Sequence, residues 1–162
     1  MAPAVKCSDC GERVDLKEGS SARCPFCSAP LNVTIDLETG RVLVSPVVLV
    51  VDDEEQSRDV ARAILEREGY AVLEASNGPD ATLLAAEHEP PFVLLDERMP
   101  AMTGEDTSKL IRRVAPEAVI IAFSAILDER PPWADAHLPK DKIDSLAAVL
   151  SSLSQERSKG PG

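Results

Sequence analysis

Apolar runs alternate along most of the chain with segments whose apolar residues recur at helical spacing. Short runs typical of buried parallel strands are predicted at 47–51, 70–75, 92–95, 118–123 and 136–138. Amphipathic helices are predicted at 55–68, 79–88, 104–114 and 142–153. This alternation predicts the α/β fold class, with a doubly wound five-stranded parallel sheet and helices on both faces.

The start of the chain follows a β pattern instead. Residues 13–17 can form a strand. Apolar residues alternate with polar ones over 31–37, a turn follows at 38–40, and a second apolar run occupies 41–44. Together these segments predict a small β module that includes a hairpin.

Ser45-Pro46 is the predicted junction between the two patterns. We therefore expect a β domain at 1–45, an α/β domain at 46–155 and a flexible tail at 156–162. The tail is expected to be disordered because it is rich in serine, lysine, glycine and proline.

All four cysteines lie in the β module, as the CxxC pairs Cys7/Cys10 and Cys24/Cys27, which 13 residues separate. Two such pairs are typical of a structural zinc site, in which four thiolates leave no open position for catalysis. The module resembles a zinc ribbon, and we expect the metal to supply much of its folding free energy. Iron and redox-active disulfides are the alternatives for these thiols.

Polar residues follow the predicted strands of the α/β domain. Asp52 and Asp53 come after the first strand, Asp96 after the third, Ser124 after the fourth and Lys140 after the fifth. Because the carboxyl ends of parallel strands meet at one edge, these side chains are expected to converge there. Clustered carboxylates repel one another, and a divalent cation such as Mg²⁺, which prefers oxygen ligands, relieves that repulsion.

This arrangement resembles the receiver domain of two-component response regulators. The residues that carry the resemblance are Asp52-Asp53, Asp96 with Met99-Pro100 and Gly104, Ser124, and Lys140 after Pro139. The resemblance implies a flavodoxin-like fold and a phosphoacceptor at Asp96, assisted by Lys140 and Ser124.

The resemblance also implies a Mg²⁺ site formed by Asp52, Asp53, Asp96 and the backbone carbonyl of Arg98. The phosphoryl group would come from a histidine kinase or a phosphotransfer protein. Ser124 and His137, which stands where the family usually has a switching Tyr or Phe, would then form the conformational switch.

The segment between Ser124 and Lys140 departs from the family pattern. It is short, and Pro131-Pro132 prevents a continuous helix across it. We therefore expect the fourth helix of the receiver fold to be shortened or absent. Trp133 is expected to cover the resulting gap, with a role in partner binding as the alternative.

Charge and hydropathy narrow the possible partners. The net charge is −11, and residues 46–162 carry 12 basic and 22 acidic side chains, so nucleic-acid binding by the large domain is unfavourable. Nucleic-acid binding by the zinc ribbon is an alternative that its near-neutral charge and few aromatic residues disfavour. Without a membrane-spanning apolar run or a signal-peptide core, the protein is expected to be cytoplasmic and to have no membrane partner.

The expected function is that of a response regulator in a phosphorelay, which accepts a phosphoryl group on Asp96 and signals through protein contacts. Its chemistry would be limited to its own phosphorylation and dephosphorylation, so it is not expected to be a conventional enzyme. A phosphorylation-independent scaffold or adaptor with a receiver fold is the alternative.

Overall fold

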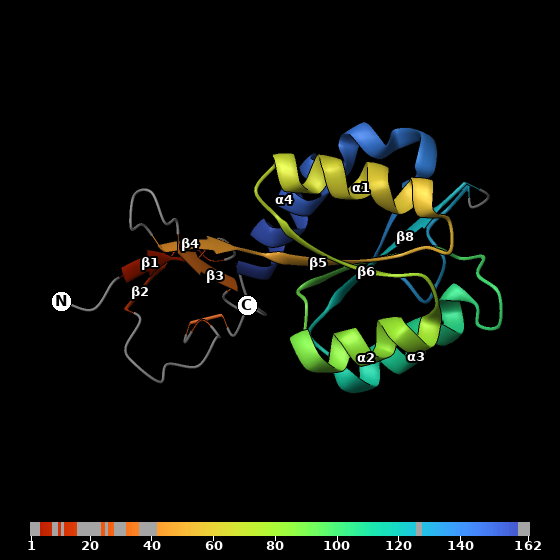
Figure 1. Ribbon diagram of the computed structural model, residues 1–162, viewed down its shortest axis with the longest axis horizontal. Helices are drawn as coiled ribbons and strands as arrows, with labels where there is room; N and C mark the ends of the chain where they lie inside the picture. The colour runs from red at the N-terminus through yellow and green to blue at the C-terminus, as the bar shows by residue number, and fades with distance from the viewer. Residues whose placement is uncertain are drawn as a thin grey trace.

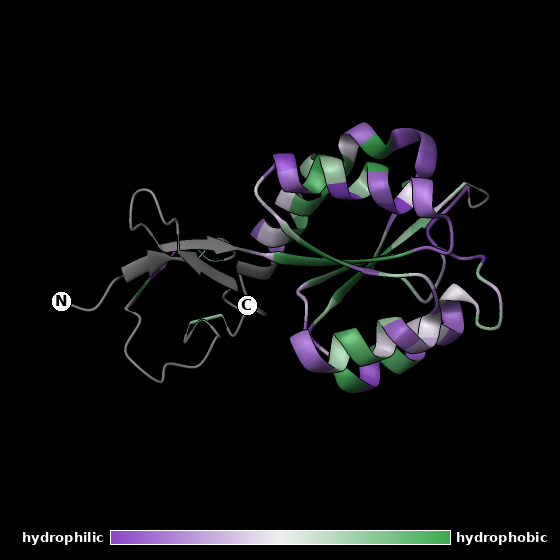
Figure 2. Ribbon diagram, in the orientation of Figure 1, coloured by the Kyte–Doolittle hydropathy of each residue, from purple (hydrophilic) through white to green (hydrophobic). Residues whose placement is uncertain are grey.

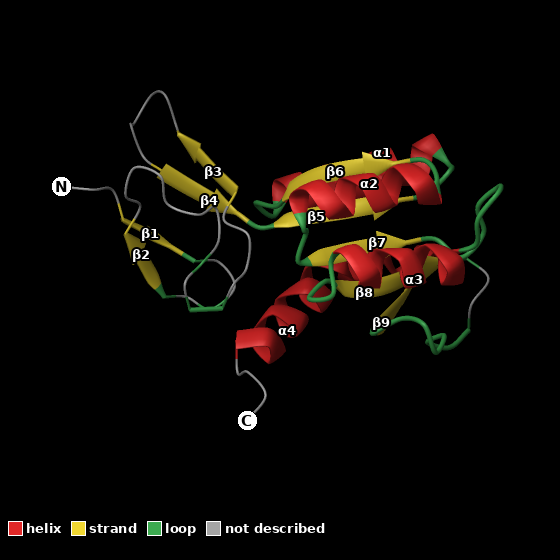
Figure 3. Cartoon of the chain, turned by 90° about the horizontal axis from the view of Figure 1, so that it is seen from below, coloured by secondary structure: helices red, strands yellow, loops and turns green. Residues whose placement is uncertain are grey.

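The computed structural model describes residues 4–7, 10, 12–15, 24, 26–27, 32–35, 42–125 and 128–158. Its main unit is a five-stranded parallel sheet in the order β6-β5-β7-β8-β9, which can be followed in Figure 3. The strands are β5 (Val47–Val51), β6 (Ala71–Ala75), β7 (Phe92–Leu95), β8 (Val119–Ser124) and β9 (Ala136–Pro139).

Four α-helices cover the two faces of this sheet. On one face lie α1 (Glu55–Arg67) and α4 (Leu146–Ser158), and on the other α2 (Gly78–His88) and α3 (Gly104–Val114), as Figure 1 shows. Apolar residues concentrate in the strands of the sheet, whereas the helices combine apolar and polar residues (Figure 2). The predicted doubly wound, flavodoxin-like α/β fold is confirmed.

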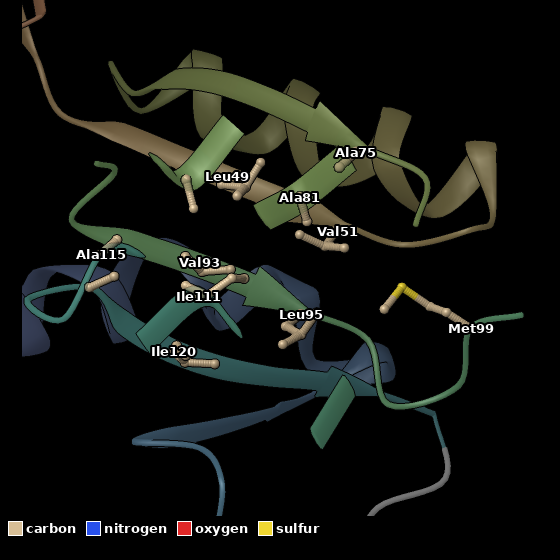
Figure 4. Close-up of a cluster of buried hydrophobic side chains, with 12 residues drawn as sticks. Leu49, Val51, Ala75, Ala81, Val93, Leu95, Met99, Ile111, Ala115 and Ile120 are labelled. Atoms are coloured by element: carbon tan, nitrogen blue, oxygen red, sulfur yellow. The ribbon is translucent and has the colours of Figure 1, made fainter. Parts of the chain in front are cut away.

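The core has two halves, one on each face of the sheet. Figure 4 shows the half beneath α2 and α3, where side chains of β5 and β7, such as Leu49 and Val93, meet Ile111 of α3. Every residue of β5 and β7 is buried. Because each fully buried Leu, Val or Ile contributes about 1.5–3 kcal/mol, this core fixes the positions of the two central strands and of the residues that follow them.

The end of the α/β unit differs from its prediction. A single helix was expected over 142–153, but a 3-10 helix, η1 (Lys140–Ser145), precedes α4, with non-helical backbone at Lys142. The assignment of 156–158 to a flexible tail is wrong, because α4 continues through Ser158. Gln155, Glu156 and Arg157 favour helix, so the helix extends past its last core contact. Residues 159–162 lie outside the described part of the chain.

The connection from β8 to β9 contains no helix in its described residues, 125 and 128–135, in agreement with the expected loss of the fourth helix. The connection is anchored to α3, because the Arg112 Nη2 group donates to the Trp133 carbonyl at 3.0 Å and lies 3.2 Å from the Asp135 carboxylate. The Trp133 ring is half-buried against the apolar cluster under α3. It therefore covers the core, as expected.

The amino-terminal module consists of two antiparallel strand pairs in the described residues. One pair is β1 (Ala4–Lys6) with β2 (Arg13–Asp15), and the other is β3 (Asn32–Ile35) with β4 (Val42–Ser45). The second pair agrees with the predicted hairpin, although its turn at 38–40 lies outside the described residues. β1 was not predicted. In the described part of the chain, no helix has both the length and the apolar character to cross a membrane.

Candidate functional site

The acidic residues converge because their strands are neighbours. Val51, the last residue of β5, pairs in register with Leu95, the last residue of β7, so Asp52 and Asp96 leave adjacent strands at the same level. One carboxylate oxygen from each of Asp52, Asp53 and Asp96 lies within 4.8 Å of the other two. The structure therefore places all three predicted acids in one cluster.

Lys140 places its ammonium beside this cluster. Its Nζ lies 2.6 Å from Asp52 Oδ2 and 3.7 Å from Asp96 Oδ2. It also donates a hydrogen bond of 3.3 Å to the Ser57 hydroxyl in the first turn of α1. The predicted lysine thus neutralises part of the charge of the acids.

Burial differs among the acids. Asp52 is fully buried and Asp96 is 6% exposed, whereas Asp53 is exposed to solvent. The Glu54 amide donates to Asp52 Oδ1 at 3.0 Å. Asp52 Oδ2 has no hydrogen-bond donor among the described residues besides the ammonium of Lys140. A buried carboxylate oxygen whose partner is a cationic group belongs to a site suited to positive charge.

The electrostatics of the cluster shift two pKa values. Burial and then the charge of Asp52 raise the pKa of Asp96 to about 6, although Lys140 opposes the shift. Burial alone would lower the pKa of Lys140, but its contact with Asp52 and the charge of Asp96 raise the pKa above its ordinary value. The cluster therefore carries an excess of negative charge that one ammonium does not balance.

The loop after β7 closes tightly around the backbone of Asp96. The Gly104 amide donates to the Glu97 carbonyl at 3.0 Å, and a Cβ atom at position 104 would lie 2.5 Å from the Asp96 carbonyl oxygen. Only glycine fits this close approach of two backbone segments. Thr103 then caps α3 by accepting a hydrogen bond from the Asp106 amide.

The two residues predicted to form the switch lie on neighbouring strands. Ser124 is the buried last residue of β8 and pairs with Pro139, while His137 of β9 pairs with Ala122. The His137 Nε2 atom is buried and has no hydrogen-bond partner in the described structure. Arg98 has an exposed side chain, and its predicted role rests on its carbonyl alone.

The pattern of strand ends did not reveal two residues of α1 that contact the site. Ser57 contacts Lys140, and the Arg58 Nη1 group donates to the Asp52 carbonyl at 2.7 Å. The sequence predicted only the helix on which both residues lie. Their position in the sequence could have indicated these contacts. The first turns of a helix that follows the acidic pair must pass beside the edge of the sheet where the acids lie.

The four cysteines also converge. The Cys7 and Cys27 sulfurs lie 3.7 Å apart, as do those of Cys10 and Cys24, and all four can lie within 4.8 Å of one another. These separations exceed the roughly 2.05 Å of a disulfide bond. Tetrahedral coordination at metal–sulfur distances of about 2.3 Å places sulfurs about 3.8 Å apart, which fits the observed spacing.

The local backbone favours thiolate at one of these positions. Burial alone would raise the pKa of the Cys24 thiol, but hydrogen bonds with the backbone at Cys27 and Phe26 give a pKa below its ordinary value. Backbone amides that donate to a sulfur stabilise its charged form, which is the form that binds metals.

Comparison with known proteins identifies the α/β unit. Residues 48–131 match the family model described as the response regulator receiver domain. The chain is 36% identical over 86 residues to the autoinducer 1 sensor kinase/phosphatase LuxN of Vibrio harveyi, a match that covers 53% of this chain and 10% of that protein. It is 31% identical over 87 residues to the polar-differentiation response regulator DivK of Brucella anthropi, covering 51% and 71% respectively.

Solved structures agree with this match. A CheY-like receiver domain protein from Methanospirillum hungatei has a TM-score of 0.64 at 22% identity, with coverage of 71% of this chain and 98% of that one. The response regulator protein TrrA, solved in complex with histidine kinase ThkA, gives a structure match with a TM-score of 0.61 at 30% identity, covering 67% and 97%. The match covers nearly the whole of each solved chain. By contrast, this chain spans about a tenth of the length of LuxN.

Proposed function

Because the chain belongs to the response regulator receiver domain family, we propose that it serves in a phosphorelay by accepting a phosphoryl group on Asp96. One observation carries the proposal: three carboxylates lie together with an ammonium 3.7 Å from Asp96. The proposed donor is a phosphohistidine of a histidine kinase or of a phosphotransfer protein. The solved complex of a histidine kinase with a similar response regulator supports this choice.

We propose Mg²⁺ as the cofactor of this site. The donors are hard carboxylate oxygens, and among the described residues the buried Asp52 Oδ2 atom has no partner besides the Lys140 ammonium, so the residues fit the ion. Asp52, Asp53 and Asp96 would hold it, and the family resemblance adds the carbonyl of Arg98. When bound, Mg²⁺ would neutralise charge on the phosphoryl oxygens.

In the proposed transfer, a carboxylate oxygen of Asp96 attacks phosphorus. The new P–O bond forms as the P–N bond breaks, and the imidazole leaves with the bonding electron pair and takes up a proton. Because the pKa of Asp96 is about 6, its ionised, nucleophilic form predominates at neutral pH. The Lys140 ammonium is placed to stabilise the added negative charge.

The response to phosphorylation is proposed to begin at Ser124. Ser124 ends β8, which pairs with β7, the strand that Asp96 follows, so its hydroxyl would hydrogen-bond with a phosphoryl oxygen after a movement toward Asp96. His137 on the adjacent strand would follow this movement. Such a switch shifts a population between two conformations, and the active one would be recognised by a protein partner.

For the amino-terminal module we propose a structural zinc ion held by Cys7, Cys10, Cys24 and Cys27. The sulfur spacing and the thiolate-stabilising amides around Cys24 support this assignment. With four protein ligands, the ion would have a structural role, without an open position for a substrate.

Intact mass spectrometry tests the proposed function. After incubation with acetyl phosphate and Mg²⁺, the wild-type chain should gain the mass of one phosphoryl group, and Asp96→Asn should not. Asp106→Asn, which alters an exposed acid in the first turn of α3, should behave as wild type. A wild-type chain that gains no mass, or an Asp96→Asn variant that gains as much, would favour a phosphorylation-independent scaffold.

A further inference from the structure

Arg58 is the residue of α1 that holds the backbone of the acidic site. Its side chain is 17% exposed, and its Nη1 group donates a 2.7 Å hydrogen bond to the Asp52 carbonyl. That carbonyl lies just beyond the last residue of β5, after Val51. The hydrogen bond is thus made where the chain leaves the sheet and enters the site.

The peptide plane that Arg58 holds joins Asp52 to Asp53. Since the peptide group is planar, the direction of the Asp52 carbonyl also sets the position of the Asp53 Cα atom. The Asp52 amide is fixed separately, because it donates to the Ala75 carbonyl of β6 at 3.1 Å. Arg58 therefore completes the restraint on the segment that presents both carboxylates.

Arg58 is itself held by the edge strand. Its Nε atom lies 3.7 Å from Glu74 Oε1, and Arg62 Nη1 lies 2.7 Å from Glu74 Oε2. Glu74 is half-buried on β6, where it pairs in register with Val50 of β5. One carboxylate thus links two successive turns of α1 to the sheet beside the site.

We propose that Arg58 is a positioning residue for the acidic cluster. It orients the Asp52-Asp53 segment so that both carboxylates face Asp96, and Glu74 holds its guanidinium in place. The inference rests on the proposed function of the cluster as a Mg²⁺ and phosphoacceptor site. The planar guanidinium can donate to a carbonyl with one nitrogen while another faces a carboxylate, which a lysine ammonium cannot do in the same geometry.

The test measures Mg²⁺ affinity of the full chain by calorimetric titration. Arg58→Gln should weaken binding about tenfold, the usual scale for a residue that orients metal ligands. Arg58→Lys should also weaken binding. Its ammonium keeps the charge but has one nitrogen, so it does not restore both the hydrogen bond to the Asp52 carbonyl and the contact with Glu74. Arg67→Gln removes the same charge from an exposed position of the same helix and should stay within about twofold of wild type.

A second readout does not depend on the metal. The Glu54 amide donates to Asp52 Oδ1, so its NMR resonance should shift in both Arg58 variants without Mg²⁺ and remain unchanged in Arg67→Gln. Arg58→Lys keeps the charge and the helix, so it decides the question even if Arg58→Gln unfolds.

Normal Mg²⁺ affinity and an unshifted Glu54 amide in Arg58→Lys would overturn the positioning role, as would equal weakening by Arg67→Gln. If the wild-type chain takes up a phosphoryl group but the Arg58 variants give either of these outcomes, only the role of Arg58 fails. If wild type neither binds Mg²⁺ nor takes up a phosphoryl group, the proposed function fails, and the role of Arg58 falls with it.

Discussion

At the residue scale, the site concentrates like charges in a place that water reaches poorly. Asp52 and Asp96 are both buried, and Lys140 is the ammonium that contacts them. Because Asp96 is buried and lies beside the charge of Asp52, its ionisation is less favourable than in the unfolded chain. The same repulsion that costs stability prepares the site for a cation.

The raised pKa of Asp96, which burial and then the charge of Asp52 cause, predicts how stability depends on pH in the absence of Mg²⁺. The pKa of Asp96 is about 6 in the folded chain against an ordinary value of 3.8, so the folded state binds this proton more tightly. The free energy of unfolding should therefore fall as pH rises from about 4 to about 6. At pH 7, Asp96→Asn should be more stable than wild type by about 1–2 kcal/mol, after allowance for solvent screening.

Urea unfolding of both proteins near pH 4 and at pH 7, without added Mg²⁺, measures this difference. The two proteins should differ little near pH 4. Added Mg²⁺ should stabilise wild type more than Asp96→Asn. Equal stabilities at pH 7 would show that the charges at the site are already balanced.

The sequence predicted the acids and the lysine of the site because parallel strands place their ends at one edge. Asp52 and Asp96 follow strands whose residues are all apolar, and Lys140 follows a shorter run that ends at Pro139. Ser57 and Arg58 were missed because a helical pattern gives the apolar face but not which polar side chains reach a neighbouring loop. The tight approach at Gly104 likewise depends on two segments that only the tertiary structure brings together.

At the element scale, the chain replaces a helix with an anchored loop. The predicted bounds of β5, β7 and α3 coincide with the observed ones, because each has strong periodicity and clear ends. The last helix was predicted too short because its final turn has few apolar residues. The loop between β8 and β9 could be predicted as non-helical from its prolines, but its anchor on Arg112 could not, since the two are distant in sequence.

Trp133 should be the main apolar contribution of this loop to stability. Its ring packs on the core under α3, and its indole hydrogen-bonds with the Glu97 carboxylate, opposing the rise in the Glu97 pKa that burial causes. Trp133→Ala should lower the free energy of unfolding by about 2 kcal/mol, less than for a fully buried ring. Trp133→Phe keeps much of the packing and should cost about 1 kcal/mol.

Chemical denaturation followed by circular dichroism measures these losses. Leu83→Ala, at a side chain that is 70% exposed on α2, should change stability by less than about 0.5 kcal/mol. If Trp133→Ala were no more destabilising than Leu83→Ala, the ring would not support the core, and partner binding would become its better explanation.

At the scale of the whole molecule, two chemically different units follow one another. The cysteine cluster belongs to the segment before β5, and the acidic cluster lies at the carboxyl end of β5 and its neighbours. β4 ends at Ser45 and β5 begins at Val47. The amino-terminal module therefore joins the sheet at the amino end of β5, whereas the acidic cluster lies at its carboxyl end. We propose that the metal stabilises this module without taking part in phosphoryl transfer.

Metal analysis tests this separation of roles. The purified chain should contain one zinc ion, and Cys24→Ser should lose it because a ligand is removed. Phosphoryl uptake at Asp96 should persist in this variant. Bound iron, a mass that indicates disulfides, or loss of phosphoryl uptake in Cys24→Ser would contradict the proposed zinc site or its independence.

The most direct measurement locates the phosphoryl group itself. Borohydride reduces the acyl phosphate of an aspartate to homoserine, and peptide mass spectrometry then identifies the modified residue. After treatment with acetyl phosphate and Mg²⁺, the modification should lie at Asp96 and should depend on Lys140 and Asp53. A modification at another residue, or none in the wild-type chain, would contradict the assignment of this cluster as a phosphoacceptor site.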